Sequence, residues 1–159
     1  MAAILESNES SGQAAKEISD LCSLFRQLRE NGIKIAICTS DSRKFFLRKG
    51  TLTTLRRLQL EDHVDVVVCG DDAGSIPKPH PHNALSICRA LDVDPQDTLL
   101  VGDTLADMGM GRSANLGSTV GVLSGVCDIN ELRPQADHIV RDVSELLPIV
   151  LDMRRWSLS

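Results

Sequence analysis

The sequence lacks the features that mark membrane, secreted and nucleic-acid-binding proteins. None of its apolar runs approaches the ~20 residues that a membrane-spanning helix requires, so we expect no membrane partner. The first twelve residues carry neither a basic flank nor a long apolar segment, so we expect no secretory signal. A net charge of −5 provides no basic face for a phosphate backbone, which argues against a nucleic-acid partner.

The sequence also has no C-x-x-C pair, and its five cysteines are widely spaced. An odd number of scattered cysteines indicates neither a disulfide framework nor a zinc site. Such residues are typical of small buried hydrophobes in a reducing compartment, so we expect a cytoplasmic protein. The five are Cys22, Cys38, Cys69, Cys88 and Cys127.

What the chain does contain is a regular alternation of short apolar runs and helical spacing. The 159 residues are enough for one domain, which we expect over 13–155, after a polar, Ser-rich N-terminus (1–12) that we expect to be frayed. Alternation of this kind predicts a three-layer α/β/α Rossmann-like fold with a parallel sheet. Strands are expected at 33–38, 64–69, 98–101, 118–123 and 138–140, and helices at 13–31, in the stretch up to Leu60, and at 84–91, 105–115 and 143–153.

Two carboxylates follow the predicted strand at 98–101. The run Val101-Gly102-Asp103 ends this strand, and Asp107 follows four residues later. Parallel strands deliver such residues to the carboxyl edge of the sheet, where α/β proteins bind ligands. Two neighbouring acids repel unless a cation joins them, and Mg²⁺ prefers oxygen ligands. The alternative is a loop acid followed by an acid that caps the next helix.

Two further strand ends carry groups that suit a phosphate. Thr39 and Ser40 place two hydroxyls beside a helix N-terminus, although simple capping of that helix is the alternative. Lys78 stands between two prolines that fix the backbone, although a solvated surface lysine is the alternative. Hydroxyl, lysine and paired acids, in this order on successive strands, favour a site for phosphate and Mg²⁺.

These residues resemble the motifs of the haloacid dehalogenase (HAD)-like hydrolases, in particular the phosphoglycolate-phosphatase-like branch. The resemblance covers about 32–150. It rests on I-K-I-A-I-C-T-S at 33–40, K-P-H-P at 78–81 and L-L-V-G-D-T-L-A-D at 99–107, with G-V-L-S-G at 121–125 following in the same order.

The resemblance implies a Mg²⁺-dependent hydrolase of small phosphomonoesters that works through an aspartyl-phosphate. It implies that Thr39 holds the phosphoryl oxygens, with the Ser40 amide close by. Lys78 would neutralise phosphate charge and orient the nucleophile. Asp103 would ligate Mg²⁺, and Asp107 would support the metal site, partly through water. The implied partner is a small phosphorylated metabolite or inorganic phosphate.

One departure from the family stands against activity. The first family motif, D-x-D-x-[TV], supplies the nucleophile and the general acid/base, and no such motif occurs here. The only aspartate before Thr39 is Asp20, within a predicted helix, and the only D-x-D is 92–94, in a helix-to-strand loop. The cap domain is absent too. Because a catalytic unit without one member keeps only a small residual rate, we expect this chain to be inactive or severely impaired.

The same departure predicts that the first strand of the family's sheet is missing. We expect the strands that end at Thr39 and Gly102 to pair directly, because unpaired edges inside a sheet are costly. One rival is a strand from elsewhere, for which Ala2–Leu5 is the only local candidate. The other is strand donation by a second copy, which would make a homodimer.

Three functional hypotheses follow. The chain is an incomplete phosphatase core, or a non-catalytic phosphate- or Mg²⁺-binding module that regulates a partner, or a structural domain that docks through an exposed sheet edge. The substrate is not specified, because selectivity in such enzymes comes from the cap.

Overall fold

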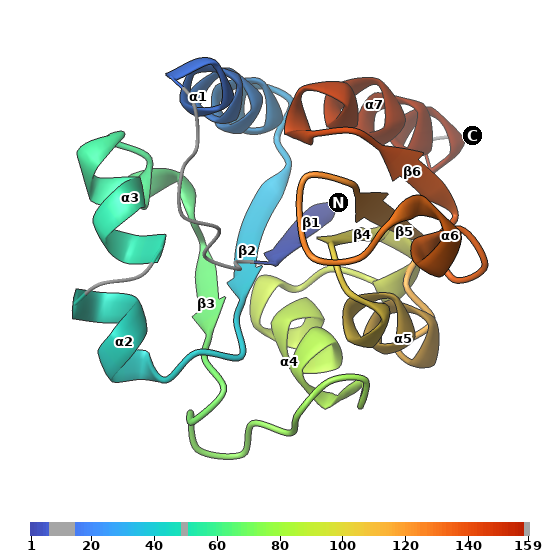
Figure 1. Cartoon of the computed structure of the whole chain (residues 1–159), viewed down its shortest axis with the longest axis horizontal. Helices are drawn as coiled ribbons and strands as arrows, with labels where there is room; N and C mark the ends of the chain where they lie inside the picture. The colour runs from blue at the N-terminus through green and yellow to red at the C-terminus, as the bar shows by residue number, and fades with distance from the viewer. Residues whose placement is uncertain (7–14, 49–50, 158–159) are drawn as a thin grey trace.

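Six parallel strands form one sheet, in the order β3-β2-β1-β4-β5-β6 (Figure 1). The computed structural model describes residues 1–6, 15–48 and 51–157, and statements of number or absence refer to these. Helices cover both faces, so the predicted α/β/α Rossmann-like class is confirmed. The strands are β1 Ala2–Glu6, β2 Lys34–Cys38, β3 Val66–Val68, β4 Thr98–Gly102, β5 Ser118–Val122 and β6 His138–Val140.

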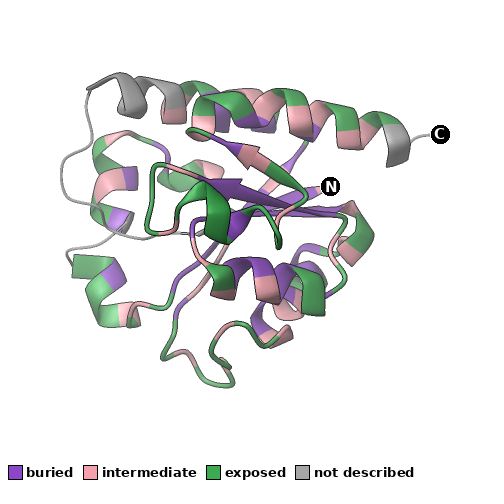
Figure 2. Ribbon diagram, turned by 45° about the vertical axis from the view of Figure 1, so that its right-hand side comes forward, coloured by how far each residue is buried: buried purple, intermediate pink, exposed green. Residues whose placement is uncertain are grey.

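Most helices lie where the 3.6-residue spacing predicts them, with bounds that differ by up to four residues, and the short helix Ile129–Leu132 was not predicted. Helices α1 and α7 lie together over one face of the sheet, and α4 and α5 cover the other (Figures 1 and 2). The α-helices are α1 Ala15–Glu30, α2 Arg43–Arg48, α3 Thr51–Arg57, α4 His82–Leu91, α5 Leu105–Ser113, α6 Ile129–Leu132 and α7 Leu146–Ser157. The 3-10 turns are η1 Glu61–His63, η2 Pro95–Asp97 and η3 Val143–Glu145.

The hydrophobic core has two halves, one on each face of the sheet. Alternate strand residues divide between them: Ile35 and Ile37 join the half under α1 and α7, whereas Ala36 and Cys38 join the half under α4 and α5. All residues of β4 and β5 are buried (Figure 2). Burial on both sides explains why these strands are mostly apolar without alternation, as is usual in parallel sheets.

Strand β1 occupies the central position of the sheet. Ala2–Glu6 pair in register with Lys34–Cys38, and Ala2–Leu5 pair with Thr98–Val101. Three expectations are therefore wrong, and the first is that this strand of the sheet is missing. The N-terminus is not frayed over Ala2–Glu6, although residues 7–12 lie outside the described part of the chain, and β2 does not pair with β4.

The reason lies in what a central strand requires. A strand of five residues suffices when both of its edges are hydrogen-bonded, because its polar backbone groups are then paired on two sides. Ala2, Ala3 and Ile4 are at most 1% exposed, and such small apolar side chains fit between two layers of helices. Strand donation by a second copy is not needed to complete the sheet.

Three of the five cysteines are buried, as predicted, and Cys22 and Cys127 are partly exposed. All five are free thiols, and the buried ones are Cys38, Cys69 and Cys88. Gly32 ends α1 with φ of +70°, a conformation that favours glycine, and the Ile33 amide then donates to the Leu28 carbonyl at 2.9 Å. Among the described residues, there is no helix with the length and apolar character needed to cross a bilayer.

Candidate phosphate and metal site

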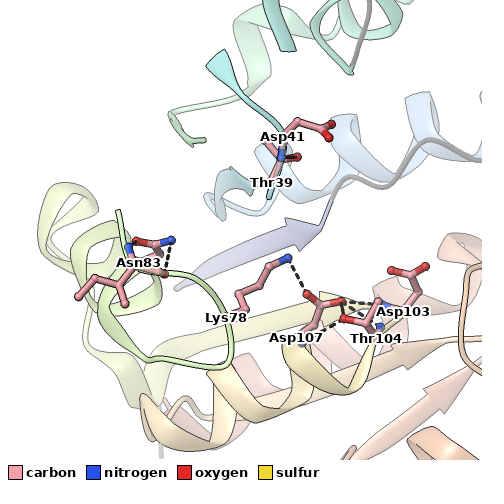
Figure 3. Close-up of polar contacts among 8 residues, drawn as sticks. Thr39, Asp41, Lys78, Asn83, Asp103, Thr104 and Asp107 are labelled. Carbon is pink, nitrogen blue, oxygen red and sulfur yellow. Dashed lines mark hydrogen bonds and ion pairs between the residues drawn. The ribbon is translucent and has the colours of Figure 1, made fainter. Parts of the chain in front are cut away.

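The predicted site residues converge at the carboxyl edge of the sheet. Thr39 directly follows β2 and Asp103 directly follows β4, so they flank the end of the central strand β1. Lys78 and Asp107 come from the segments that cover the α4/α5 face (Figure 3). The parallel sheet thus gathers groups that are up to about 70 positions apart in the sequence.

Thr39 is held in a tight loop between β2 and α2. It is only 2% exposed, and its amide donates to the Val68 carbonyl at 2.9 Å. Its Oγ1 accepts the Asp41 amide at 3.1 Å. A hydroxyl can both accept and donate hydrogen bonds, and phosphoryl oxygens are acceptors. Helix capping falls instead to Ser42, whose Oγ accepts the Phe45 amide at 3.2 Å, while Ser40 is exposed.

Lys78 is not a solvated surface lysine. Its Nζ lies 2.8 Å from Asp107 Oδ1, and the two side chains are 8% and 0% exposed. The neighbouring Pro79 packs against α5 so closely that a Cβ on Gly109 would lie 2.7 Å from Pro79 Cβ. The segment that carries Lys78 is therefore docked on the same helix that carries Asp107.

Asp107 combines two of the roles considered from the sequence. Its Oδ2 accepts the Thr104 amide at 3.0 Å, the Thr104 hydroxyl at 2.7 Å and the Asp103 amide at 3.2 Å. With the return bond from the Asp107 amide to Thr104 Oγ1, this makes a capping box that begins α5. Because Oδ2 is held by the cap and Oδ1 by Lys78, the carboxylate has a single orientation.

Asp103 stands at the end of β4 with an 8% exposed side chain. Its Oδ2 accepts the Val126 amide at 2.8 Å, and its carbonyl accepts the Cys127 amide at 3.1 Å. A Cβ on Gly125 would lie 2.0 Å from Asp103 Oδ2, so only glycine allows this approach. Gly125, at the end of the G-V-L-S-G segment, and the following Val126 amide therefore hold the Asp103 carboxylate.

The donor set suits a hard cation that keeps much of its water. Among the described side chains, no three His, Cys, Asp or Glu residues gather closely enough to hold a metal by themselves. Mg²⁺ does not need such a cage, since it is held through one or two carboxylates with waters and substrate phosphates. Asp103 is the carboxylate here that could ligate such an ion directly, whereas Asp107, whose oxygens are held by Lys78 and the α5 cap, could support it through water.

The central strand brings one further acid to this edge. Glu6 is the last residue of β1 and pairs in register with Cys38, the residue before Thr39. Sequence reasoning missed Glu6 because Ala2–Glu6 had not been assigned to the sheet. The only D-x-D, at 92–94, instead joins α4 to η2, whose Pro95–Asp97 precede β4, so it lies toward the opposite edge.

Sequence reasoning also missed three polar residues that hold the loops of the site. Asn83 is buried in the first turn of α4, and Arg43 and Asp72 link the loops that follow β2 and β3. The only signal in the sequence was the acidic pair after Gly70, because a polar loop residue does not reveal its partner.

The fold is a parallel α/β/α core that brings a hydroxyl, a lysine and two carboxylates to one strand edge, where α/β proteins bind ligands. Residues 9–115 match the family described as haloacid dehalogenase-like hydrolase, which is more than half of the chain. The chain therefore belongs to the HAD-like hydrolases, and its relatives lie in the phosphatase-like branch.

Several individual proteins are similar to it. Pyrophosphatase PpaX of Bacillus thuringiensis is 30% identical over 146 residues, and that of Bacillus mycoides is 31% identical. Both alignments cover 90% of this chain, but only 63% and 64% of the relatives. A putative β-phosphoglucomutase from Thermotoga maritima superposes with a TM-score of 0.69 at 27% identity, covering 82% of this chain and 57% of that one.

Proposed function

We propose that this chain is an HAD-like phosphatase core that binds inorganic phosphate, or the phosphoryl group of a small metabolite, together with Mg²⁺. The observation that carries the proposal is the buried Lys78–Asp107 pair beside Asp103, at the edge of the sheet where Thr39 also lies. Burying charges is costly unless they are paired, and a buried pair at a ligand-binding edge is a candidate functional site.

Each residue has a defined part in this proposal. The Thr39 hydroxyl and the Ser40 amide donate to phosphoryl oxygens, and Lys78 supplies a positive charge held in a fixed direction by Asp107. Asp103, supported by Asp107, would hold the metal. Bound Mg²⁺ would supply charge neutralisation at the phosphoryl group.

We further propose that turnover by this chain is severely impaired. The D-x-D-x-[TV] motif that supplies the family's nucleophile and general acid/base is absent from the sequence. Loss of the nucleophile leaves only binding and electrostatic effects. Glu6, at the end of β1, is the acid whose backbone lies nearest in register to Thr39, and it is the residue to test for residual activity.

The absence of that motif also favours a second candidate function. Thr39, Lys78 and Asp103 are each held in place by hydrogen bonds or an ion pair, although the sequence lacks the nucleophile motif. A non-catalytic phosphate- or Mg²⁺-binding module with a regulatory role would have this combination. It predicts stoichiometric binding without turnover.

Calorimetry with inorganic phosphate and with tungstate, in the presence of Mg²⁺, tests the binding site. The wild-type chain should bind weakly, and Lys78→Ala should weaken binding about tenfold or more, because a desolvated cation–anion contact is lost. Arg155→Ala is the matched control, since it removes the same charge from an 84% exposed side chain on α7. Equal affinity in wild type and Lys78→Ala, or no binding in either, would rule the site out.

Hydrolysis of p-nitrophenyl phosphate tests the proposed impairment of turnover. The wild-type chain with Mg²⁺ should be no faster than Asp103→Ala. Turnover that is lost in Asp103→Ala would refute the proposed impairment. Parallel loss in Glu6→Gln would then identify Glu6 as the carboxylate that has taken over a catalytic role.

A further inference from the structure

Two loops of the site are in direct contact. One follows β2 and carries Thr39, and the other follows β3 and leads to Lys78. The Gly70 amide donates to the Asp41 carbonyl at 2.8 Å, and a Cβ on Gly70 would lie only 2.3 Å from the Ser40 carbonyl oxygen. The close approach at Gly70 means that a displacement of one loop displaces the other.

An ion pair between Arg43 and Asp72 fastens this contact. Arg43 Nε donates to Asp72 Oδ1 at 2.9 Å, and Arg43 Nη2 donates to Asp72 Oδ2, so the guanidinium engages both carboxylate oxygens. Nη2 also donates to the Val67 carbonyl at 3.1 Å, and the Arg43 amide donates to Asp71 Oδ1 at 2.6 Å. Asp72 Oδ2 accepts the Cys69 amide at 2.8 Å. Planar two-point pairing of this kind fixes geometry as well as charge.

The contacts continue from Asp72 toward Lys78. The Asp72 carbonyl accepts the Ser75 amide at 2.9 Å. The buried Asn83 side chain, labelled in Figure 3, then donates to Ser75 Oγ and to the Ile76 carbonyl, each at 3.0 Å, and its oxygen accepts the Ile76 amide at 3.1 Å. Two residues further on is Lys78. Hydrogen bonds thus run without interruption from the Thr39 loop to the segment that presents the lysine.

We propose that Arg43 and Asp72 are positioning residues for the phosphate site, which set the separation between the Thr39 hydroxyl and the Lys78 ammonium. This inference rests on the proposed function. Neither side chain is proposed to bind the phosphate directly. Both act by joining the two loops.

The sign of the expected effect distinguishes positioning from long-range charge. Asp72→Asn removes a negative charge, which by Coulomb attraction alone would tighten the binding of an anion. If Asp72 instead aligns the two loops, the same substitution weakens binding, because Thr39 and Lys78 no longer meet one phosphate together.

A second arginine–carboxylate pair provides a matched control. Arg56 Nε lies 2.9 Å from Glu61 Oε2, and Arg56 Nη2 lies 3.1 Å from Glu61 Oε1. This pair joins the end of α3 to η1 and contacts neither loop of the site in the part of the chain that the structure describes. Glu61→Gln therefore removes the same charge and the same two-point geometry elsewhere on the molecule.

The experiment is calorimetric titration of the wild type, Asp72→Asn, Arg43→Lys and Glu61→Gln with inorganic phosphate and Mg²⁺, with a thermal melt of each. We expect Asp72→Asn and Arg43→Lys to bind phosphate about five- to tenfold more weakly, because Thr39 and Lys78 are no longer aligned on one phosphate. Glu61→Gln should bind phosphate as the wild type does. All three variants should melt within a few degrees of one another. Arg43→Lys keeps the positive charge and loses only the two-point pairing with the Asp72 carboxylate. It therefore tests the proposal even if Asp72→Asn does not fold.

Two results would overturn the inference in different ways. Wild-type affinity, or tighter binding, in a folded Asp72→Asn or Arg43→Lys would overturn the positioning role and leave the proposed function standing. Absence of phosphate binding in the wild type would overturn the proposed function and this inference with it.

Discussion

At the scale of single residues, the site depends on one buried ion pair. Asp107 is 0% exposed and its two oxygens are divided between Lys78 and the α5 cap. A charge so placed is tolerated only because each oxygen has a donor. The pair is thus part of the fold as well as part of the candidate site, and its removal has to affect both.

Lys78→Met tests the pair through stability. It should lower the free energy of unfolding by about 3 kcal/mol, because the Asp107 charge is left buried without its cation. The double variant Lys78→Met/Asp107→Asn should recover part of this loss, since the amide oxygen can still accept the Thr104 amide. Denaturant unfolding measures both. A cost below about 1 kcal/mol for Lys78→Met would mean that the pair is solvated rather than buried.

At the scale of elements, β1 is decisive because it joins the two halves of the sheet. It lies between β2 and β4, whose ends carry Thr39 and Asp103. Its five residues set the distance between the Thr39 loop and the Asp103 carboxylate, which are the proposed phosphate-binding and metal-binding groups. A direct β2–β4 pairing would have moved these groups closer together by one strand spacing, about 4.8 Å.

Ile4→Ala tests whether β1 is a true central strand. The side chain is 0% exposed, so its truncation should cost about 2–5 kcal/mol, whereas Leu47→Ala, on a 47% exposed side chain, should cost less than about 0.5 kcal/mol. Denaturant unfolding gives both values.

Hydrogen exchange on the wild-type monomer gives an independent reading of the same strand. The amides of Ala3–Leu5 should exchange as slowly as those of β2 and β4. Fast exchange in β1, together with strong protection in both neighbours, would instead mean that β2 and β4 pair directly.

At the scale of the whole molecule, the Arg43–Asp72 pair makes the stability of the protein depend on pH. The hydrogen bonds that Arg43 donates to Asp72 lower the pKa of Asp72 below its usual range, and the same bonds raise the pKa of Arg43. Burial raises the pKa of the nearby Cys69 thiol, which therefore stays neutral at physiological pH. Asp71 is the remaining charged neighbour. The pair can be broken by acid and not by mild base.

The free energy of unfolding, measured as the pH is lowered, tests this dependence. A carboxyl with a depressed folded-state pKa contributes stability above its unfolded value of about 3.9, and loses it as the pH falls through the lower folded value. Asp72→Asn should therefore be less stable than the wild type by about 1 kcal/mol or less at pH 6–7. The two proteins should converge as the pH falls below the lowered folded-state pKa of Asp72. A difference that is the same at pH 7 and at a pH below that pKa would show that the charge of Asp72 contributes nothing.

The sequence by itself determined the fold class and four groups of the candidate site. Buried parallel strands appear as short apolar runs, and parallel strands share one carboxyl edge, so polar residues that directly follow such runs must come together. Thr39 and Asp103 were placed in this way, and Lys78 and Asp107 by their motifs. Most helices followed from periodicity, including α7, which tolerates Pro148 within its first turn, whereas the four-residue α6 was not predicted.

Only the tertiary structure decided which residues pair with which. Ala2–Glu6 carries a weak local signal, and it becomes a strand because β2 and β4, about 30 and 95 residues away, bond both of its edges. The Lys78–Asp107 and Arg43–Asp72 pairs each span 29 residues. A side chain's partner across such a distance depends on how the helices pack on the sheet, which local pattern and propensity do not specify.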